Sequence, residues 1–151
     1  MANLSPRKIN LFLLMKLPSA FLCGVRVKEL TEARCVVSVK HRWINQNPFR
    51  SMYFAVQAMA AELTTGALVM SEIRKSGGNI SMLVGSNRAD FSKKATGRIT
   101  FTCNDGHLVS QAVTQSIATG EGQAISLKSI GTDENGAVVS EMEFEWNVKV
   151  K

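Results

Sequence analysis

One nearly uncharged stretch restricts the folds open to this chain of 151 residues. Residues 51–71 carry a single charge, Glu62, and are otherwise small, apolar or neutral. A carboxylate at the centre of a membrane span costs roughly 2.5–3.5 kcal/mol or more, which argues against a span. A helix that is apolar nearly all round must then be enclosed by protein. We therefore predict a buried central helix over about residues 49–66 and no membrane span.

The cysteines indicate the compartment. Cys23, Cys35 and Cys103 are an odd number and form no CxxC pair. A chain of this length can bury a core without disulfides. We therefore expect reduced thiols in a cytoplasmic protein. His41 and His107 stand in no metal-ligand spacing, so no metal site is expected.

An N-terminal helix is expected over about residues 5–17. Ser5 suits the N-cap, Pro6 suits the first helical position, and Pro18 should end the helix. A signal peptide is the alternative explanation of the apolar run in this region. That run is only seven residues long before Lys16 interrupts it, and Leu22 lies where a small residue should precede the cleavage point.

Alternating patterns predict strands on both sides of the central helix, with a second helix among them. Strands are expected at 25–29, 34–43, 79–92, 97–104, 123–131 and 137–150, and the helix at 107–119. The inner face of the second strand should carry Cys35, Val37, Val39, His41 and Trp43. The inner face of the last strand should carry Val138, Met142, Phe144, Trp146, Val148 and Val150, with Val139, Glu141, Glu143, Glu145 and Lys149 outside. A curved antiparallel sheet wrapped around one apolar helix buries both parts, so we expect an α+β fold in a single domain, residues 1–151.

The net charge of +6 is concentrated in the first third of the chain. Residues 1–50 carry nine Lys or Arg and two acids, whereas residues 51–151 carry nine and ten. On the second strand, Arg34, Lys40 and Arg42 should share the outer face. This basic surface could attract an anionic partner. A nucleic-acid partner is not expected, because the chain has no such motif and a single Tyr.

This order of elements, with Asn47-Pro48-Phe49-Arg50-Ser51-Met52-Tyr53-Phe54-Ala55 opening the central helix, resembles the hotdog fold. More closely, the chain is similar to the thioesterase-like hotdog family of bacterial proteins. The resemblance covers nearly the whole chain and is most specific from Asn47 to Gly66. It implies an acyl-CoA or acyl-carrier-protein thioester as substrate, assembly as a homodimer or homotetramer, and no cofactor apart from the CoA of the substrate.

The resemblance also assigns candidate catalytic residues. In phenylacetate-pathway thioesterases of this fold, an asparagine is followed six residues later by His-Gly-Gly, and a catalytic Asp or Glu lies seven residues beyond the second glycine. By that spacing the asparagine falls on Asn47 and the carboxylate on Glu62. The triplet falls on Tyr53-Phe54-Ala55, where none of the three is kept. A non-catalytic protein that binds an acyl chain or acyl-CoA is therefore the alternative function.

Thioester hydrolysis needs a base or nucleophile and a group that stabilises the oxyanion. Glu62 is the candidate for the first role, and the start of the helix for the second. Burial should raise the pKa of Glu62, which suits a general base toward water or a nucleophile that forms a mixed anhydride. The alternative is a carboxylate that reaches solvent or pairs with a cation. Unpaired amides at the helix start, that of Ala55 among them, can stabilise an oxyanion. Ala55 and Glu62 lie about 10 Å apart along a helix, so we expect a site composed of two subunits.

Further residues are candidates for substrate binding. Asn47 could position water or the acyl carbonyl, or it could be only a turn residue before Pro48. The resemblance places a loop near the CoA phosphates after the third strand. The remaining substrate-binding candidates are Gln57, Thr65, Lys93, Lys94 and Arg98. No GxGxxG, Walker or GxSxG pattern is present, so neither nucleotide hydrolysis nor a serine hydrolase is supported.

Overall fold

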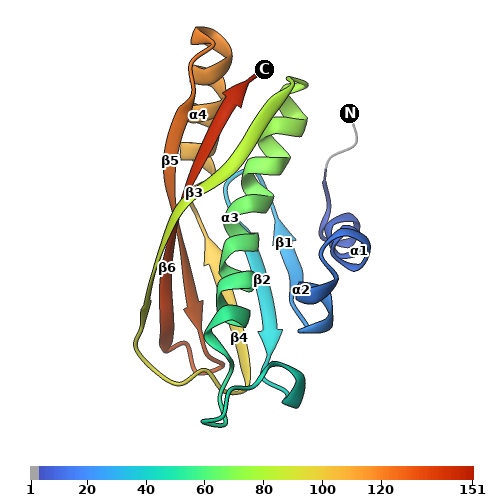
Figure 1. Ribbon diagram of the computed structural model, residues 1–151, viewed down its shortest axis with the longest axis vertical. Helices are drawn as coiled ribbons and strands as arrows, with labels where there is room; N and C mark the ends of the chain where they lie inside the picture. Colours follow the sequence, from blue (N-terminus) through green and yellow to red (C-terminus); the bar gives the residue numbers. More distant parts are fainter. Residues whose placement is uncertain (1–3) are drawn as a thin grey trace.

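The computed structural model of the chain describes residues 4–151, so the first three residues of the expected domain lie outside the described part. Six strands form one antiparallel sheet in the order β1-β2-β4-β5-β6-β3 (Figure 1). They are β1 (Arg26–Leu30), β2 (Cys35–Lys40), β3 (Ile80–Phe91), β4 (Arg98–Cys103), β5 (Gln123–Thr132) and β6 (Val138–Val150). The sheet curves around helix α3 (Phe54–Ser76), and the α+β hotdog fold expected from the sequence is confirmed.

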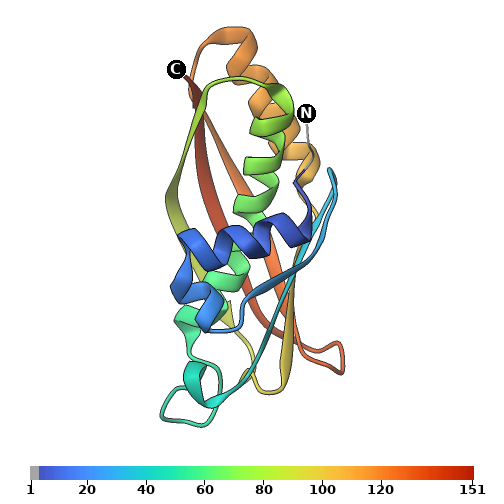
Figure 2. The same ribbon diagram turned by 90° about the vertical axis from the view of Figure 1, so that its right-hand side faces the viewer.

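Three further helices cover this central unit. Helices α1 (Pro6–Lys16) and α2 (Pro18–Leu22) lie outside α3, and α1 crosses over it in Figure 2. Helix α4 (Gly106–Thr119) packs against α3, β5 and β6. The cap predicted for α1 is present, because Ser5 has extended backbone and its Oγ accepts a hydrogen bond from the Lys8 amide at 3.4 Å. Leu17 breaks the helix just before Pro18, as expected.

Helix α3 is longer than predicted and begins later. The expected start at residue 49 is wrong because residues 46–52 form a closed turn, held by a bridge between Gln46 and Met52. The expected end at Gly66 is also wrong. There the missing side chain makes room for the Trp146 ring, whose Cζ2 would lie 3.1 Å from an added Cβ. The helix continues to Ser76 and ends at Gly77, which has the left-handed φ of 68° that glycine adopts readily.

Burial of α3 follows the prediction. Its buried residues include Val56, Ala60, Ala61, Leu63, Thr64, Thr65, Ala67, Leu68 and Val69. Within residues 4–151, α3 is the one helix long and apolar enough to cross a bilayer, and most of its apolar window is buried inside the fold. It is therefore a core helix, and the sheet and the outer helices supply the enclosure that its composition requires.

The second strand is shorter than predicted. It ends at Lys40, and residues Trp43–Asn45 form the 3-10 helix η1, so His41 and Trp43 do not continue its inner face. Trp43 is 83% exposed. The Asn45 side chain donates hydrogen bonds to the carbonyl oxygens of Lys40 and Cys23, both at 2.9 Å, and these bonds turn the chain out of the sheet.

The inner face of the last strand is correct except at its start. Met142, Phe144, Trp146 and Val148 are buried as predicted. The predicted faces of Val138 and Val139 are wrong, because Val139 is fully buried and Val138 is exposed. The register moves from Thr132–Val138 to Gly131–Ser140, which leaves Val139 as an extra residue. Such a bulge shifts the following side chains to the other face.

Within residues 4–151, strand β3 forms one edge of the sheet and pairs only with β6. Every residue from 85 to 91 on this strand is exposed. A long exposed edge offers unpaired backbone groups to another strand. This edge is relevant to the candidate site because Phe91, at its end, lies beside the start of α3.

Candidate functional site

A cavity of about 500 Å³ opens at the N-terminal end of α3. It lies between the turn that precedes α3 and the segment that follows β3. Its lining residues are Asn47, Pro48, Phe49, Ser51, Met52, Tyr53, Phe54, Gln57, Phe91, Ser92, Lys93, Lys94 and Ala95. Six of the predicted site residues therefore come together here, whereas Ala55, Glu62, Thr65 and Arg98 are not among the lining residues.

Asn47 supports the turn at the mouth of this cavity. Its Oδ1 accepts hydrogen bonds from the amides of Phe49 and Ser51, at 2.9 and 3.2 Å. Its Nδ2 donates to Ser51 Oγ at 3.0 Å and to the Met52 carbonyl at 3.4 Å. These contacts occupy both ends of the amide group. Asn47 therefore shapes the cavity wall in this structure, as a residue before Pro48 often does in a turn.

The first turn of α3 leaves backbone donors without partners. Tyr53 is the N-cap residue, and its side chain makes no capping bond. The Tyr53 carbonyl accepts from the amides of Val56 and Gln57, at 3.0 and 3.3 Å. Among residues 4–151, no partner is found for the amides of Phe54 and Ala55. Two unpaired N–H groups therefore lie at the positive end of a 23-residue helix; Phe54, which carries the first, lines the cavity, and Ala55 follows it directly.

Aromatic side chains form much of the cavity rim. The rings of Tyr53 and Phe54 meet edge to face at a centroid distance of 4.9 Å. Phe54 also makes an edge contact with Phe91 at 6.3 Å. All three side chains are exposed in the single chain. The Phe54 side chain occupies space that the glycine of the family pattern would leave open, which narrows the approach to the Phe54 and Ala55 amides.

Gln57 forms the buried floor of the cavity. Its Oε1 accepts a hydrogen bond from Ser140 Oγ at 2.9 Å, and its Nε2 lies 3.5 Å from the Met52 carbonyl oxygen. Both Gln57 and Ser140 are buried. The pair fixes the amide of Gln57 between α3 and β6, because a buried polar group needs a partner.

Glu62 lies further along α3 and away from this cavity. Burial raises the pKa of its carboxyl group above the ordinary value. Within the described part of the chain, its carboxylate takes part in no hydrogen bond or salt bridge. Gly66 flanks it, and a Cβ added there would lie 3.3 Å from Glu62 Oε1. Glu62 is therefore a half-buried acid that keeps some exposure to solvent and has no cation beside it within residues 4–151.

The Thr65 hydroxyl group takes part in two hydrogen bonds inside the fold. Its Oγ1 donates to the Glu62 carbonyl at 2.8 Å and accepts from Trp146 Nε1 at 2.9 Å. Thr65 is fully buried. The contacts tie the helical turn that carries Glu62 to β6, so Thr65 positions this part of the helix.

The three predicted cations separate into two groups. Lys93 pairs with Asp133, and this hydrogen bond lowers the pKa of that carboxyl group. Lys94 Nζ lies 3.4 Å from the Phe49 carbonyl oxygen. Both lysines line the cavity. Arg98 instead extends over β2, where its Nη1 lies 3.4 Å from Ser38 Oγ.

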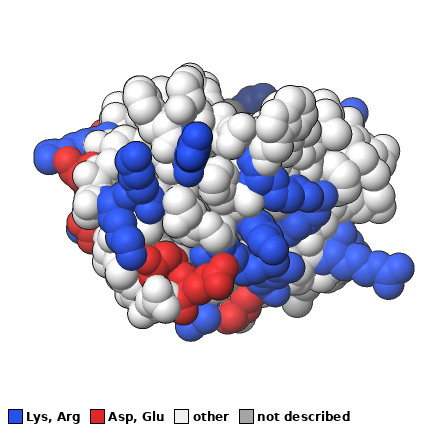
Figure 3. Space-filling model, turned by 90° about the horizontal axis from the view of Figure 1, so that it is seen from below, with Lys and Arg blue, Asp and Glu red and all other residues white. Residues whose placement is uncertain are grey.

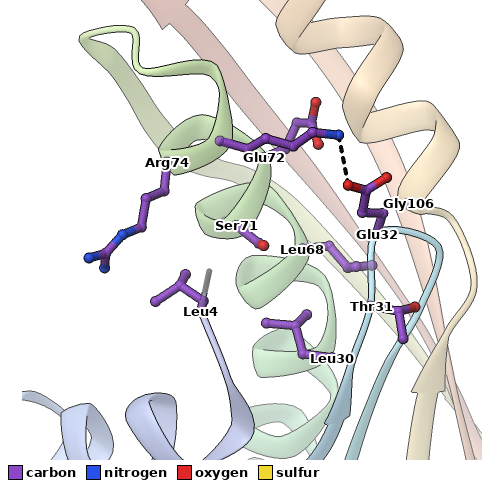
Figure 4. Close-up of a pocket in the computed structure, with 10 residues that line it drawn as sticks. Leu4, Leu30, Thr31, Glu32, Leu68, Ser71, Glu72, Arg74 and Gly106 are labelled. Carbon is purple, nitrogen blue, oxygen red and sulfur yellow. Dashed lines mark ion pairs between the residues drawn. The ribbon is translucent and has the colours of Figure 1, made fainter. Parts of the chain in front are cut away.

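A second pocket of about 150 Å³ lies at the other end of α3 (Figure 4). Its charged groups interact with their own neighbours. Lys75 forms a salt bridge with Glu32 at 2.9 Å, and Glu72 accepts a hydrogen bond from Ser110 at 3.2 Å. It is lined by none of the residues predicted for catalysis or binding. We therefore centre the site on the cavity at the start of α3.

The described residues offer no cluster of three or more His, Cys, Asp or Glu side chains for a metal ion. Cys35 and Cys103 lie opposite each other on β2 and β4. Burial raises the pKa of each thiol to about 12, so both stay protonated and pack as small apolar groups.

Two residues of this region were not predicted from the sequence. Phe91 reaches the cavity because the β3–β6 register brings the end of β3 to the start of α3. No local sequence pattern predicts this contact. Ser140 had a detectable signal. It is a polar residue on the inward face of a strand that otherwise buries Met142, Phe144 and Trp146.

Comparison with known proteins agrees with this fold. Residues 7–148 match a family model described as "Domain of unknown function (DUF4442)". A search of curated protein sequences finds no match. Among solved structures, a Pseudomonas aeruginosa protein of unknown function, described as a probable thioesterase, is 23% identical over 97% of both chains with a TM-score of 0.81. A thioesterase from Haemophilus influenzae is 11% identical over 99% of this chain and 93% of its own, with a TM-score of 0.73.

Proposed function

This chain belongs to the DUF4442 family and shares its fold with solved thioesterases, and from that premise we propose that it hydrolyses acyl thioesters, with acyl-CoA or acyl-carrier-protein as the carrier. The observation that carries the proposal is the cavity at the start of α3, which is lined by Phe54, with its unpaired amide, and by Lys93 and Lys94, while the unpaired amide of Ala55 follows directly along the helix. Free N–H groups can stabilise the oxyanion of a tetrahedral intermediate. Lys93 and Lys94 would face the phosphates of the carrier group.

Glu62 supplies the second half of the reaction in this proposal. Its carboxylate takes a proton from water as the water oxygen attacks the thioester carbon, and the amides of Phe54 and Ala55 hold the oxyanion. The C–S bond then breaks, and the leaving thiolate takes up the proton, giving a carboxylic acid and a free thiol. Direct attack by the carboxylate, through a mixed anhydride that water then hydrolyses, remains the alternative route.

The two halves of the site come from different subunits in this proposal. Glu62 does not line its own chain's cavity, and it lies about 10 Å along the helix from Ala55. A second copy that pairs with the exposed edge of β3 would cover Phe91 and bring the partner subunit's Glu62 toward this cavity. We therefore propose a homodimer, or a dimer of dimers, as the active form.

The test is Glu62→Gln, assayed on a panel of acyl-CoA thioesters. Loss of a general base should lower kcat by roughly 10²–10⁴-fold. Glu72→Gln is the matched control, because Glu72 lies on the same helix but hydrogen-bonds to Ser110 in the other pocket. The control should keep wild-type activity. Equal activity of the Glu62→Gln variant and the wild type would overturn the assignment.

Non-catalytic binding of an acyl chain or acyl-CoA is the second candidate function. It is favoured by the aromatic rim at Tyr53 and Phe54 and by the full engagement of the Asn47 amide in its turn. Measurable acyl-CoA binding by the wild type without any turnover would select this candidate.

A further inference from the structure

Exposed apolar side chains gather on one side of the N-terminal region. They lie on α1, α2 and η1, and they are Leu11, Leu14, Met15, Leu17, Leu22, Trp43 and Ile44. We call this set the docking face. An exposed apolar patch of several neighbouring large side chains marks an interaction site on a folded protein.

The elements that carry the docking face lie close together in the fold. A hydrogen bond of 2.9 Å from Asn45 Nδ2 to the Cys23 carbonyl joins η1 to the end of α2. Figure 2 shows α1, α2 and the segment that holds η1 on the side of the molecule that faces the viewer. The opposite sides of α1 and α2 carry Ile9, Leu13 and Ala20, which are buried in the core.

The chain segments that carry the docking face hold charges of one sign. Residues 4–28 hold Arg7, Lys8, Lys16, Arg26 and Lys28 and no acid, and residues 33–61 also hold none. In Figure 3, which views the end that carries η1, basic side chains spread over the right-hand side and no acidic one is visible there. Long apolar side chains flanked by cations are the composition of helices that lie in a lipid interface.

The charge pattern also argues against two other occupants. A second copy that met this face about a two-fold axis would bring like charges together without acids to pair them. An acidic protein would pair the cations, but it would leave several large apolar side chains, Trp43 among them, against polar surface. An anionic bilayer satisfies both features, because its headgroups pair with Lys and Arg while Trp and Leu enter the interface.

We propose that the docking face binds the protein to an anionic lipid surface, with Trp43 and the outer leucines of α1 and α2 in the headgroup region. This inference goes beyond thioester hydrolysis and does not depend on it. It uses a surface of the fold that is separate from the cavity at the start of α3.

The experiment uses the full chain and vesicles of phosphatidylcholine, with or without about a third phosphatidylglycerol. Trp43 is exposed and Trp146 is buried, so a change in tryptophan emission on mixing reports on the docking face. We expect a blue shift, quenching by brominated lipid and co-sedimentation with the anionic vesicles. Binding to phosphatidylcholine alone should be at least about tenfold weaker, and added salt should reduce the anionic binding.

Two matched pairs of variants locate the contact. Ile44→Ser removes a side chain that is 50% exposed on the docking face, and Ile117→Ser removes one that is 49% exposed on α4. Lys16→Glu reverses a charge beside the face, and Lys149→Glu does the same on β6. The first variant of each pair should bind roughly tenfold more weakly, and the second should bind as the wild type does.

Three results would overturn the proposal. The first is equal affinity for neutral and anionic vesicles, or for Ile44→Ser and Ile117→Ser. The second is a blue shift of Trp43 that depends on protein concentration without lipid, which would assign the face to a second copy. The third is a shift on addition of poly-glutamate but not of vesicles, which would assign it to an acidic protein.

Discussion

Glu62 is the one charged residue in residues 51–71, and its partly buried carboxyl group has no hydrogen-bond or ion-pair partner among residues 4–151. Burial without compensation favours the neutral acid. The raised pKa has one physical cause, desolvation, because no neighbouring charge opposes or adds to it. A carboxyl group in this condition lowers the stability of the folded chain at neutral pH, and it is suited to accept a proton during catalysis.

Glu62→Gln should therefore stabilise the protein at neutral pH. The pKa of Glu62 is higher in the folded chain than in the unfolded chain, so between these two values the folded state binds the extra proton. Stability of the wild type then falls as pH rises through that interval, by about 1.4 kcal/mol for each pKa unit. Urea unfolding of wild type and variant from acid to neutral pH measures this difference. The control Glu72→Gln retains Glu62, so it should keep the wild-type pH slope.

At the scale of elements, the start of α3 determines what the candidate site can bind. The turn held by Asn47 delays the helix to Phe54, and so places the first free amide, that of Phe54, at the cavity rather than outside it. Had the helix begun at residue 49, the free donors would lie about 7.5 Å further out, at 1.5 Å per residue.

Ala55→Pro tests the role of the free amides. Proline removes the N–H of Ala55 at a position of the first turn where a helix tolerates it. Loss of one oxyanion donor should lower kcat by roughly 10²–10³-fold. Ala55→Ser keeps the amide and is the control. Circular dichroism and the Tm establish whether both variants fold, and unchanged turnover by folded Ala55→Pro would contradict the role.

A second element contact sets the position of α4. Gly106, its first residue, lies so close to the β1–β2 turn that an added Cβ would be 1.9 Å from the Glu32 carbonyl oxygen. Gly106→Ala should destabilise the protein by about 1–3 kcal/mol, because backbone must move to admit the methyl group. Gly122→Ala, where the nearest atom is 3.8 Å away, should change the free energy of unfolding far less. Urea denaturation of both variants compares them directly.

At the scale of the whole molecule, the sheet has an unprotected edge. Residues 85–91 of β3 are exposed, and the aromatic rings of Phe54 and Phe91 lie at the same border. Natural proteins cover or blunt such edges, and a second copy covers one by continuing the sheet. The same arrangement would complete the proposed site.

Leu83→Lys should weaken this assembly. Leu83 is 68% exposed on β3, and a two-fold interface would contain the new charge twice. Sedimentation should show the wild type at about twice 16.5 kDa and the variant shifted toward the monomer, with activity lost in parallel. Ile117→Lys on α4 is the control and should leave both the oligomeric state and the activity unchanged. A monomeric wild type with full activity would exclude the composite site.

Much of this protein was determined by the sequence alone. The uncharged run around Glu62 required an enclosed helix, and the alternation in residues 142–148 identified the buried face of the last strand, because both signals are local. The tertiary structure decided the rest. It turned Trp43 outward through the hydrogen bond from the Asn45 side chain to the Cys23 carbonyl, moved Val139 inward through a bulge, and extended α3 past Gly66 against Trp146. Each of these depends on contacts between residues far apart in the chain, which local periodicity does not encode.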